Sequence, residues 1–153
     1  MNNQTANEST FQKFLTAQEG IYPKALAEIR NGKKETHWMW FIFPQLRFLG
    51  VSDMAKTYGI ADLDEAKTYL ADSILGFRLR QITEELLNLG QQDPEAIFGD
   101  IDAMKLRSCM TLFAHADGSE DSVFAKVLQQ YFGGKEDDKT NTILKIQAFD
   151  FTK

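Results

Sequence analysis

The side chains best suited to chemistry lie in one stretch of this chain, which reads Thr36-His37-Trp38-Met39-Trp40-Phe41-Ile42-Phe43-Pro44-Gln45. It contains both tryptophans and one of the two histidines. At the N-terminus of a helix the dipole favours a neutral imidazole, so His37 could carry a proton within an aromatic pocket. The competing interpretation is a histidine that is hydrogen-bonded at the edge of the core. His37 is therefore a candidate catalytic residue.

The tryptophans and the glutamine of this stretch are candidates for ligand binding. Trp38 or Trp40 could stack on a planar ligand such as a nucleobase or nicotinamide. Residues two apart point to different sides of a helix, so core packing is expected for at least one of them. Gln45 could hydrogen-bond the amide edge of a ligand or the backbone of its own loop. Trp40 and Gln45 are the candidate ligand-binding residues.

A second group of polar side chains is spaced along one edge of a predicted helix, at Lys105, Ser108 and Thr111. A serine beside a desolvated lysine can act as a nucleophile, which makes Lys105 and Ser108 candidate catalytic residues and Thr111 a candidate ligand contact. Asp102, three residues before Lys105, favours instead an ordinary ion pair that keeps the lysine protonated. The two hydroxyls could simply bond to preceding carbonyls. Cys109 lies on the apolar face of this helix, so inert burial is expected.

Sequence motifs of known mechanism are absent from the chain. It contains no GxxxxGK[ST], GxGxxG, HExxH, CxxC or GxSxG pattern. With one cysteine and two histidines, a metal site is not expected. The sequence therefore predicts no cofactor.

The elements that position these groups are all predicted to be helices. Apolar spacing and stop signals place them at about residues 9–19, 23–31, 38–43, 52–58, 62–71, 74–89, 94–98, 100–115, 119–132 and 138–147. Residues 33–35 are expected to form a solvated connector, and Phe98-Gly99 should end one helix before the next begins. No convincing pair of strands is present. The fold class predicted is all-α, one domain of about eight to ten helices across residues 1–153, with residues 1–8 frayed.

Several of these helices carry a recognisable start signal. Thr36, Ser52 and Ser119 are the expected N-caps of three of them, and Asp62 with Glu65 resembles a capping box. Asp138 or Thr140 is expected to cap the last helix.

Composition limits the classes of function. A net charge of -5 and a pI near 5.0 argue against nucleic-acid binding and against a membrane-surface role. The longest apolar run, from Trp38 to Phe43, is far shorter than the ~20 residues of a membrane span. The single cysteine excludes an intrachain disulfide, and the polar first ten residues are unlike a signal peptide. A cytoplasmic protein is expected.

The chain also resembles a known family from about Phe11 to Thr142. The matching landmarks are Phe14, Ala17-Gln18, Tyr22, Ala25-Leu26, Gly32, the string HWMWFIFPQ, Gly50-Val51-Ser52, Ala55, Tyr58-Gly59-Ile60, Glu65-Ala66, Tyr69-Leu70, Leu75-Gly76-Phe77-Arg78-Leu79, Phe98-Gly99, Asp102, Lys105-Leu106 and Ser108-Cys109-Met110-Thr111-Leu112-Phe113. They are similar to those of a bacterial family of unknown function that is sometimes given the label calpastatin. The resemblance implies an all-helical fold and supplies no catalytic residues.

Two departures from the family pattern are visible, at Ser73, where proline is usual, and at Cys109, where serine is common. If the position of Cys109 were a catalytic hydroxyl, this member would be altered there. Calpain inhibitors are disordered, proline-rich and repetitive, whereas this chain has three prolines, no repeats and many rings. A calpain-inhibitor function is therefore rejected.

Two hypotheses of function follow. In the first, the protein binds or acts on a small molecule in a pocket lined by the six candidate residues. A similarity in helical character to domains that act on ADP-ribose-type compounds makes a nucleotide or NAD-derived ligand the first choice. In the alternative, it is a non-enzymatic protein-interaction domain with a purely structural aromatic core and an unidentified protein partner. Convergence of His37, Gln45 and Lys105 on one cavity open to solvent would favour the first hypothesis.

Overall fold

Helices account for the regular structure in the computed structural model of this chain, which describes residues 11–151. The expected fraying of residues 1–8 lies outside the described residues. A first helical segment covers residues 11–18. The elements that follow it are α2 (Tyr22–Arg30), α3 (Met39–Ile42), the 3-10 turn η1 (Arg47–Leu49), α4 (Asp53–Tyr58), α5 (Leu63–Ala71), α6 (Leu75–Asn88), α7 (Pro94–Asp117), α8 (Val123–Phe132) and α9 (Asp138–Phe151). The predicted all-α class is confirmed.

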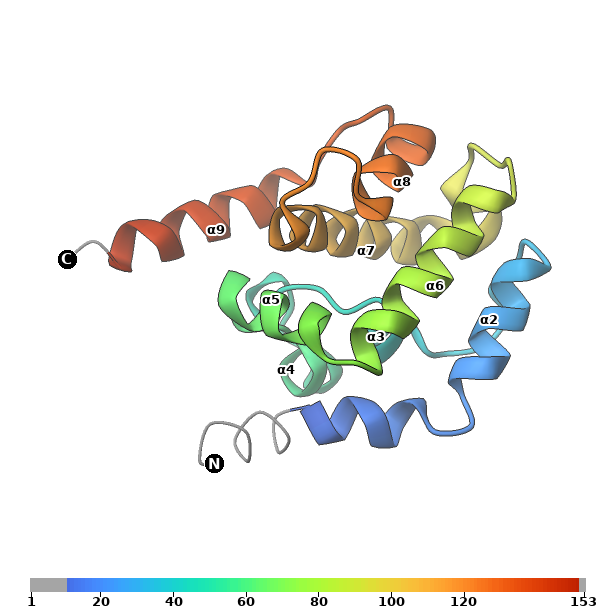
Figure 1. Ribbon diagram of the computed structural model, residues 1–153, viewed down its shortest axis with the longest axis horizontal. Helices are drawn as coiled ribbons and strands as arrows, with labels where there is room; N and C mark the ends of the chain where they lie inside the picture. The colour runs from blue at the N-terminus through green and yellow to red at the C-terminus, as the bar shows by residue number, and fades with distance from the viewer. Residues whose placement is uncertain (1–10, 152–153) are drawn as a thin grey trace.

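Helices α6 and α7 make most of the packing contacts between elements, and α7 is the longest element. It packs against α8, α5 and α9, while α6 packs against α8, α5 and α2 (Figure 1). The second half of α9 runs outward from the body of the molecule (Figure 1). Outside the helices, Leu46 and Ile60 form one isolated parallel bridge in the described chain. No helix among residues 11–151 is long and apolar enough to cross a membrane.

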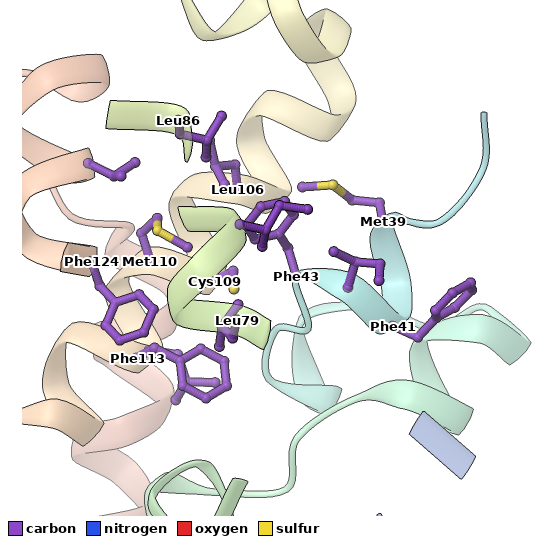
Figure 2. Packing of buried hydrophobic residues seen from close by; sticks show 14 of the residues in the cluster. Met39, Phe41, Phe43, Leu79, Leu86, Leu106, Cys109, Met110, Phe113 and Phe124 are labelled. Atoms are coloured by element: carbon purple, nitrogen blue, oxygen red, sulfur yellow. The ribbon is translucent and has the colours of Figure 1, made fainter. Parts of the chain in front are cut away.

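Aromatic rings fill the space between these helices. The ring of Phe43 packs edge-on against the ring of Phe98, with 6.0 Å between the ring centroids. It packs in a tilted arrangement against Trp38, with 6.2 Å between the centroids. Figure 2 shows Phe43 reaching toward Leu106 of α7, while Phe41 points away to the other side. Burying a large apolar side chain contributes about 1.5–3 kcal/mol, so this short segment stabilises the fold well beyond its length.

Two of the predicted helix starts are confirmed by hydrogen bonds. The hydroxyl of Ser52 accepts from the main-chain N–H of Ala55 at 3.1 Å, and Asp62 accepts from Glu65 at 2.9 Å. The predicted break at Gly99, between the helices expected at 94–98 and 100–115, is also confirmed. Gly99 has a φ of 77° and a ψ of 172° inside α7, so the helix axis changes there in a conformation that favours glycine.

Three other predicted caps are wrong. Thr36 does not cap α3, whose N-cap residue is Trp38, because its hydroxyl donates to the Glu28 carboxylate at 2.7 Å. Ser119 does not cap α8 either. Its hydroxyl accepts from Asp121 within the preceding turn, and Ser122 is the N-cap.

The start of α9 is set by Asp137 rather than by Asp138 or Thr140. Its carboxylate accepts from both the main-chain N–H of Thr140 at 2.9 Å and the Thr140 hydroxyl at 2.7 Å. A side chain that lies just outside the first turn can reach these donors, whereas residues inside the turn cannot.

The corrected cap of α8 can be tested by alanine substitution. Ser122→Ala should lower the free energy of unfolding by about 1 kcal/mol, because the Ala125 N–H loses its acceptor. Ser119→Ala should cost less than about half of this, because its single turn hydrogen bond is exposed. Urea denaturation of the two variants checks the ranking, and the reverse order would contradict the assignment.

Candidate functional site

Two lysines share one carboxylate where the loop between α2 and α3 meets α7. The Nζ atom of Lys34 lies 2.9 Å from Oδ2 of Asp102, and Nζ of Lys105 lies 3.6 Å from Oδ1 of the same side chain. The Lys34 side chain is only 8% exposed. These three groups carry one net positive charge, so one of the two ammonium groups has no full counter-charge within the cluster.

Each of the two lysines also lies on a tryptophan ring. Nζ of Lys105 is 3.9 Å from the ring centroid of Trp40, and Nζ of Lys34 is 5.0 Å from that of Trp38. Such cation–π contacts contribute about 0.5–2 kcal/mol each, and more as the ammonium is desolvated. Trp38 is buried, whereas Trp40 is partly exposed. Of the two rings, Trp40 is therefore the one that can meet a ligand.

Three separate segments bring this cluster together. Lys34 follows α2, and its main-chain N–H donates to the carbonyl of Ile97 at 2.8 Å. Asp102 and Lys105 stand one turn apart on α7, just after the Gly99 break. The Asp102–Lys105 ion pair was predicted from this spacing and is confirmed. Lys34 was expected in a solvated connector, and that expectation is wrong because its ammonium is buried against Asp102.

A buried carboxylate that sequence reasoning missed shapes the loop between Lys34 and α3. Glu28 of α2 accepts from the main-chain N–H groups of Glu35 at 2.8 Å and Thr36 at 3.1 Å. It also accepts from the Thr36 hydroxyl at 2.7 Å and from Nε1 of Trp38 at 3.0 Å. A charged residue inside the apolar stripe of a predicted helix was the available signal.

These four hydrogen bonds keep Glu28 ionised. Burial by itself raises the pKa of the carboxyl, but the bonds from Thr36, Glu35 and Trp38 together outweigh it and lower the pKa to about 2. The anionic side chain therefore anchors the Trp38 indole and the loop that leads into α3.

The two groups at the ends of the aromatic stretch differ in their surroundings. His37 is exposed, and its ring makes no hydrogen bond with any residue in the described part of the chain. Gln45 is partly buried. Its carbonyl accepts from the N–H of Ile60 at 2.9 Å, and its side-chain amide has no hydrogen-bond partner among residues 11–151. Both side chains are free to meet a ligand, but no hydrogen bond or ion pair between described residues joins either of them to Lys105.

The hydroxyls of the second candidate group are both engaged. Ser108 Oγ donates to the carbonyl of Met104 at 3.2 Å. Thr111 Oγ1 donates to the carbonyl of Arg107 and accepts from the N–H of Asp137, each at 2.8 Å, and the residue is fully buried. Each bond holds α7 or the start of α9 in place.

Cys109 is buried and unpaired with another cysteine, as predicted. Burial raises the pKa of its thiol well above the ordinary value, so the thiol stays protonated at neutral pH.

Three surface hollows are found elsewhere on the described chain. One of about 370 Å³ lies between η1 and α9, one of about 150 Å³ between α5 and α9, and one of about 350 Å³ beside α8. None of these three is lined by a candidate residue. The cluster around Trp40 lines none of these three hollows.

Comparison with known proteins identifies relatives without an assigned activity. A family model described as "Protein of unknown function (DUF1810)" matches residues 8–144. No curated protein matches the chain. A solved structure matches with a TM-score of 0.84 and 43% sequence identity, covering 88% of this chain and 96% of its own. It is the crystal structure, at 1.38 Å, of the conserved hypothetical protein Rv1873 from Mycobacterium tuberculosis.

Proposed function

This chain belongs to the DUF1810 family of proteins of unknown function, and we propose that it binds a small molecule. The proposed ligand is a nucleotide or an NAD-derived compound. It binds on the surface formed by Lys34, Trp40, Asp102 and Lys105, hereafter the Trp40 surface.

The observation that carries this proposal is the Lys105 ammonium 3.9 Å above the partly exposed Trp40 ring. The pair combines an aromatic face with a cation in one place, which is what a planar base joined to a phosphate requires. Stacking of a base on an aromatic side chain contributes about 1–3 kcal/mol. Lys105 can leave the ring and pair with the phosphate while the base takes its position.

The charges around the ring favour an anion. Lys34 and Lys105 face a single carboxylate, Asp102. The ionised Glu28 carboxylate points to four neutral donors of the adjoining loop and forms no ion pair with either lysine among the described residues. In a chain with a net charge of -5, such a local surplus of ammonium groups attracts a phosphate selectively.

The remaining candidates take lesser parts in the proposal. The free side chains of His37 and Gln45 support contacts with the outer parts of the ligand, with His37 as the proton carrier if a reaction takes place. The engaged hydroxyls of Ser108 and Thr111 support a role in holding α7 rather than in contacting ligand.

A screen of nucleotides by thermal or urea denaturation tests the proposal. AMP, NAD and ADP-ribose are the probes, and adenosine, which lacks phosphate, is the matched comparison. A ligand at 100 times its Kd should add about 2.7 kcal/mol to the free energy of unfolding. Lys105→Gln should remove this gain, whereas Lys56→Gln, at an exposed position on α4, should keep it. An unchanged gain in Lys105→Gln would overturn the site.

An alternative function, a non-enzymatic protein-interaction domain, is supported by a different observation. Ile101 and Met104 are both largely exposed on the same part of α7 as Lys105. Adjacent exposed apolar side chains are typical of a surface that meets another protein. Failure of every nucleotide to stabilise the wild-type chain would favour this alternative.

A further inference from the structure

The guanidinium of Arg78 on α6 is held in one position by uncharged groups. Its Nη1 atom donates to the side-chain carbonyl of Gln18 at 3.1 Å, and its plane lies over the ring of Tyr22 at 5.2 Å. Gln18 is itself buried and donates to the carbonyl of Phe41 at 2.8 Å. The Tyr22 hydroxyl lies 2.6 Å from Oε1 of Gln81 and 3.0 Å from the carbonyl oxygen of Arg78, so its single proton is shared between two acceptors on α6.

This arrangement leaves one edge of the guanidinium without a partner. Neither Nε nor Nη2 of Arg78 makes a hydrogen bond with a described residue, and neither nitrogen is fully buried. No carboxylate in residues 11–151 lies within 4.0 Å of Arg78, in contrast to the pairs Arg30–Glu85 and Arg80–Asp117. Nε and Nη2 form the side-on edge with which arginine binds a carboxylate through two parallel hydrogen bonds.

The groups around Arg78 do not supply the missing charge. Burial raises the pKa of Tyr22 to about 12, against the opposing effect of Arg78 itself, so its hydroxyl is neutral. The Asp72 carboxylate accepts from the N–H groups of Ile74 and Leu75 at the start of α6. Glu85 pairs with Arg30. Among the described residues, the fixed guanidinium therefore has no counter-ion of its own.

Two exposed apolar side chains lie near Arg78 at the start of α6. Ile74 is 45% exposed and stands one turn before Arg78, and Phe77 is 63% exposed and directly precedes it. Residues three and four apart on a helix are neighbours on its surface, so Ile74 lies between Phe77 and Arg78. The unpaired Nε and Nη2 of Arg78 can bind a carboxylate, and the apolar surface beside them can contact an apolar group attached to that carboxylate.

We propose that Arg78, with Ile74 and Phe77, binds an aromatic or alkyl carboxylic acid at a site separate from the Trp40 surface. The carboxylate accepts two hydrogen bonds from Nε and Nη2, and the apolar group covers Phe77. The preformed position of Arg78 means that little side-chain freedom is lost on binding.

Titration with benzoate, acetate and inorganic phosphate, followed by NMR of the full chain, tests this site. Benzoate should bind at least about tenfold more tightly than acetate. On its addition, the NMR signals of residues on α6 should shift. Arg78→Lys keeps the charge but loses the fork, and should weaken benzoate about tenfold. Arg47→Lys is the matched control, because Arg47 also lies over a ring but has no buried glutamine to hold it.

Two further variants keep the outcome decisive. Phe77→Ser, at an exposed position, should reduce benzoate binding to the level of acetate without unfolding the chain. Lys105→Gln should bind benzoate as the wild type does. Equal benzoate binding in Arg78→Lys and wild type, tighter binding of phosphate than of benzoate, or loss of binding in Lys105→Gln alone would each overturn the proposal. The last of these results would place the bound acid at the Trp40 surface instead.

Discussion

Replacing Glu28 by alanine is expected to lower the free energy of unfolding by about 3–5 kcal/mol. This loss is comparable to the total free energy of unfolding of many domains. The substitution leaves the Nε1–H of Trp38 and the main-chain N–H groups of Glu35 and Thr36 without their acceptor. Each buried donor left unsatisfied costs about 1–3 kcal/mol. The loop that carries Lys34 and leads into α3 loses its anchor with them.

Urea denaturation followed by fluorescence measures this loss. In a Trp40→Phe background the emission comes from Trp38 alone, so the same experiment reports whether the indole has lost its hydrogen bond. Glu28→Gln, which keeps one carbonyl acceptor, should lose about half as much. Glu35→Ala removes an exposed side chain and should change stability by less than about 0.5 kcal/mol. A loss of under 1 kcal/mol in Glu28→Ala would contradict the anchoring role.

The low pKa of Glu28 adds a pH dependence of known sign. The carboxyl has a pKa of about 2 in the folded chain, against an ordinary value of 4.5. The unfolded state therefore binds the proton more readily, and the contribution of Glu28 is complete above pH 4.5 and is lost as the pH falls toward 2. The difference in stability between wild type and Glu28→Gln should shrink across that window.

Local sequence patterns predicted the parts of the fold that local physics decides. The caps at Ser52 and Asp62 and the break at Gly99 depend on residues within a few positions of one another, and all three are confirmed. The Ser119 prediction failed because several residues of one turn can cap a helix. Which of them does so depends on the residue at which the backbone changes from extended to helical. In α8 that residue is Ser122, whose backbone is extended.

The candidate site shows the same division between local and distant contacts. Asp102 and Lys105 are one turn apart, so their ion pair could be predicted. The contacts of Lys34 with Asp102 and of Lys105 with Trp40 join residues far apart in the sequence, which only the tertiary packing brings together. Glu28 was missed for a related reason. Its donors lie beyond the end of its own helix, where helical periodicity carries no information.

Gly76→Ala is expected to lower the free energy of unfolding by more than about 3 kcal/mol, although the position is inside a helix where alanine is normally preferred. A Cβ atom at Gly76 would overlap the carbonyl oxygen of Leu70 and lie 2.8 Å from its carbonyl carbon. These are backbone atoms at the end of α5, so they cannot turn aside as the tip of a flexible side chain can. The α5–α6 packing would have to open instead.

Gly118→Ala is the matched control. Gly118 ends α7 with a φ of 82°, and a Cβ there would meet no atom within 4 Å. Its cost is therefore the strain of a left-handed alanine alone, about 1–2 kcal/mol. Because Gly76 precedes Arg78 by two residues, the shift of α6 should also weaken benzoate binding in Gly76→Ala and leave it intact in Gly118→Ala. Equal urea midpoints for the two variants would mean that α5 and α6 have room to separate, and that the close approach at Leu70 does not fix the position of Arg78.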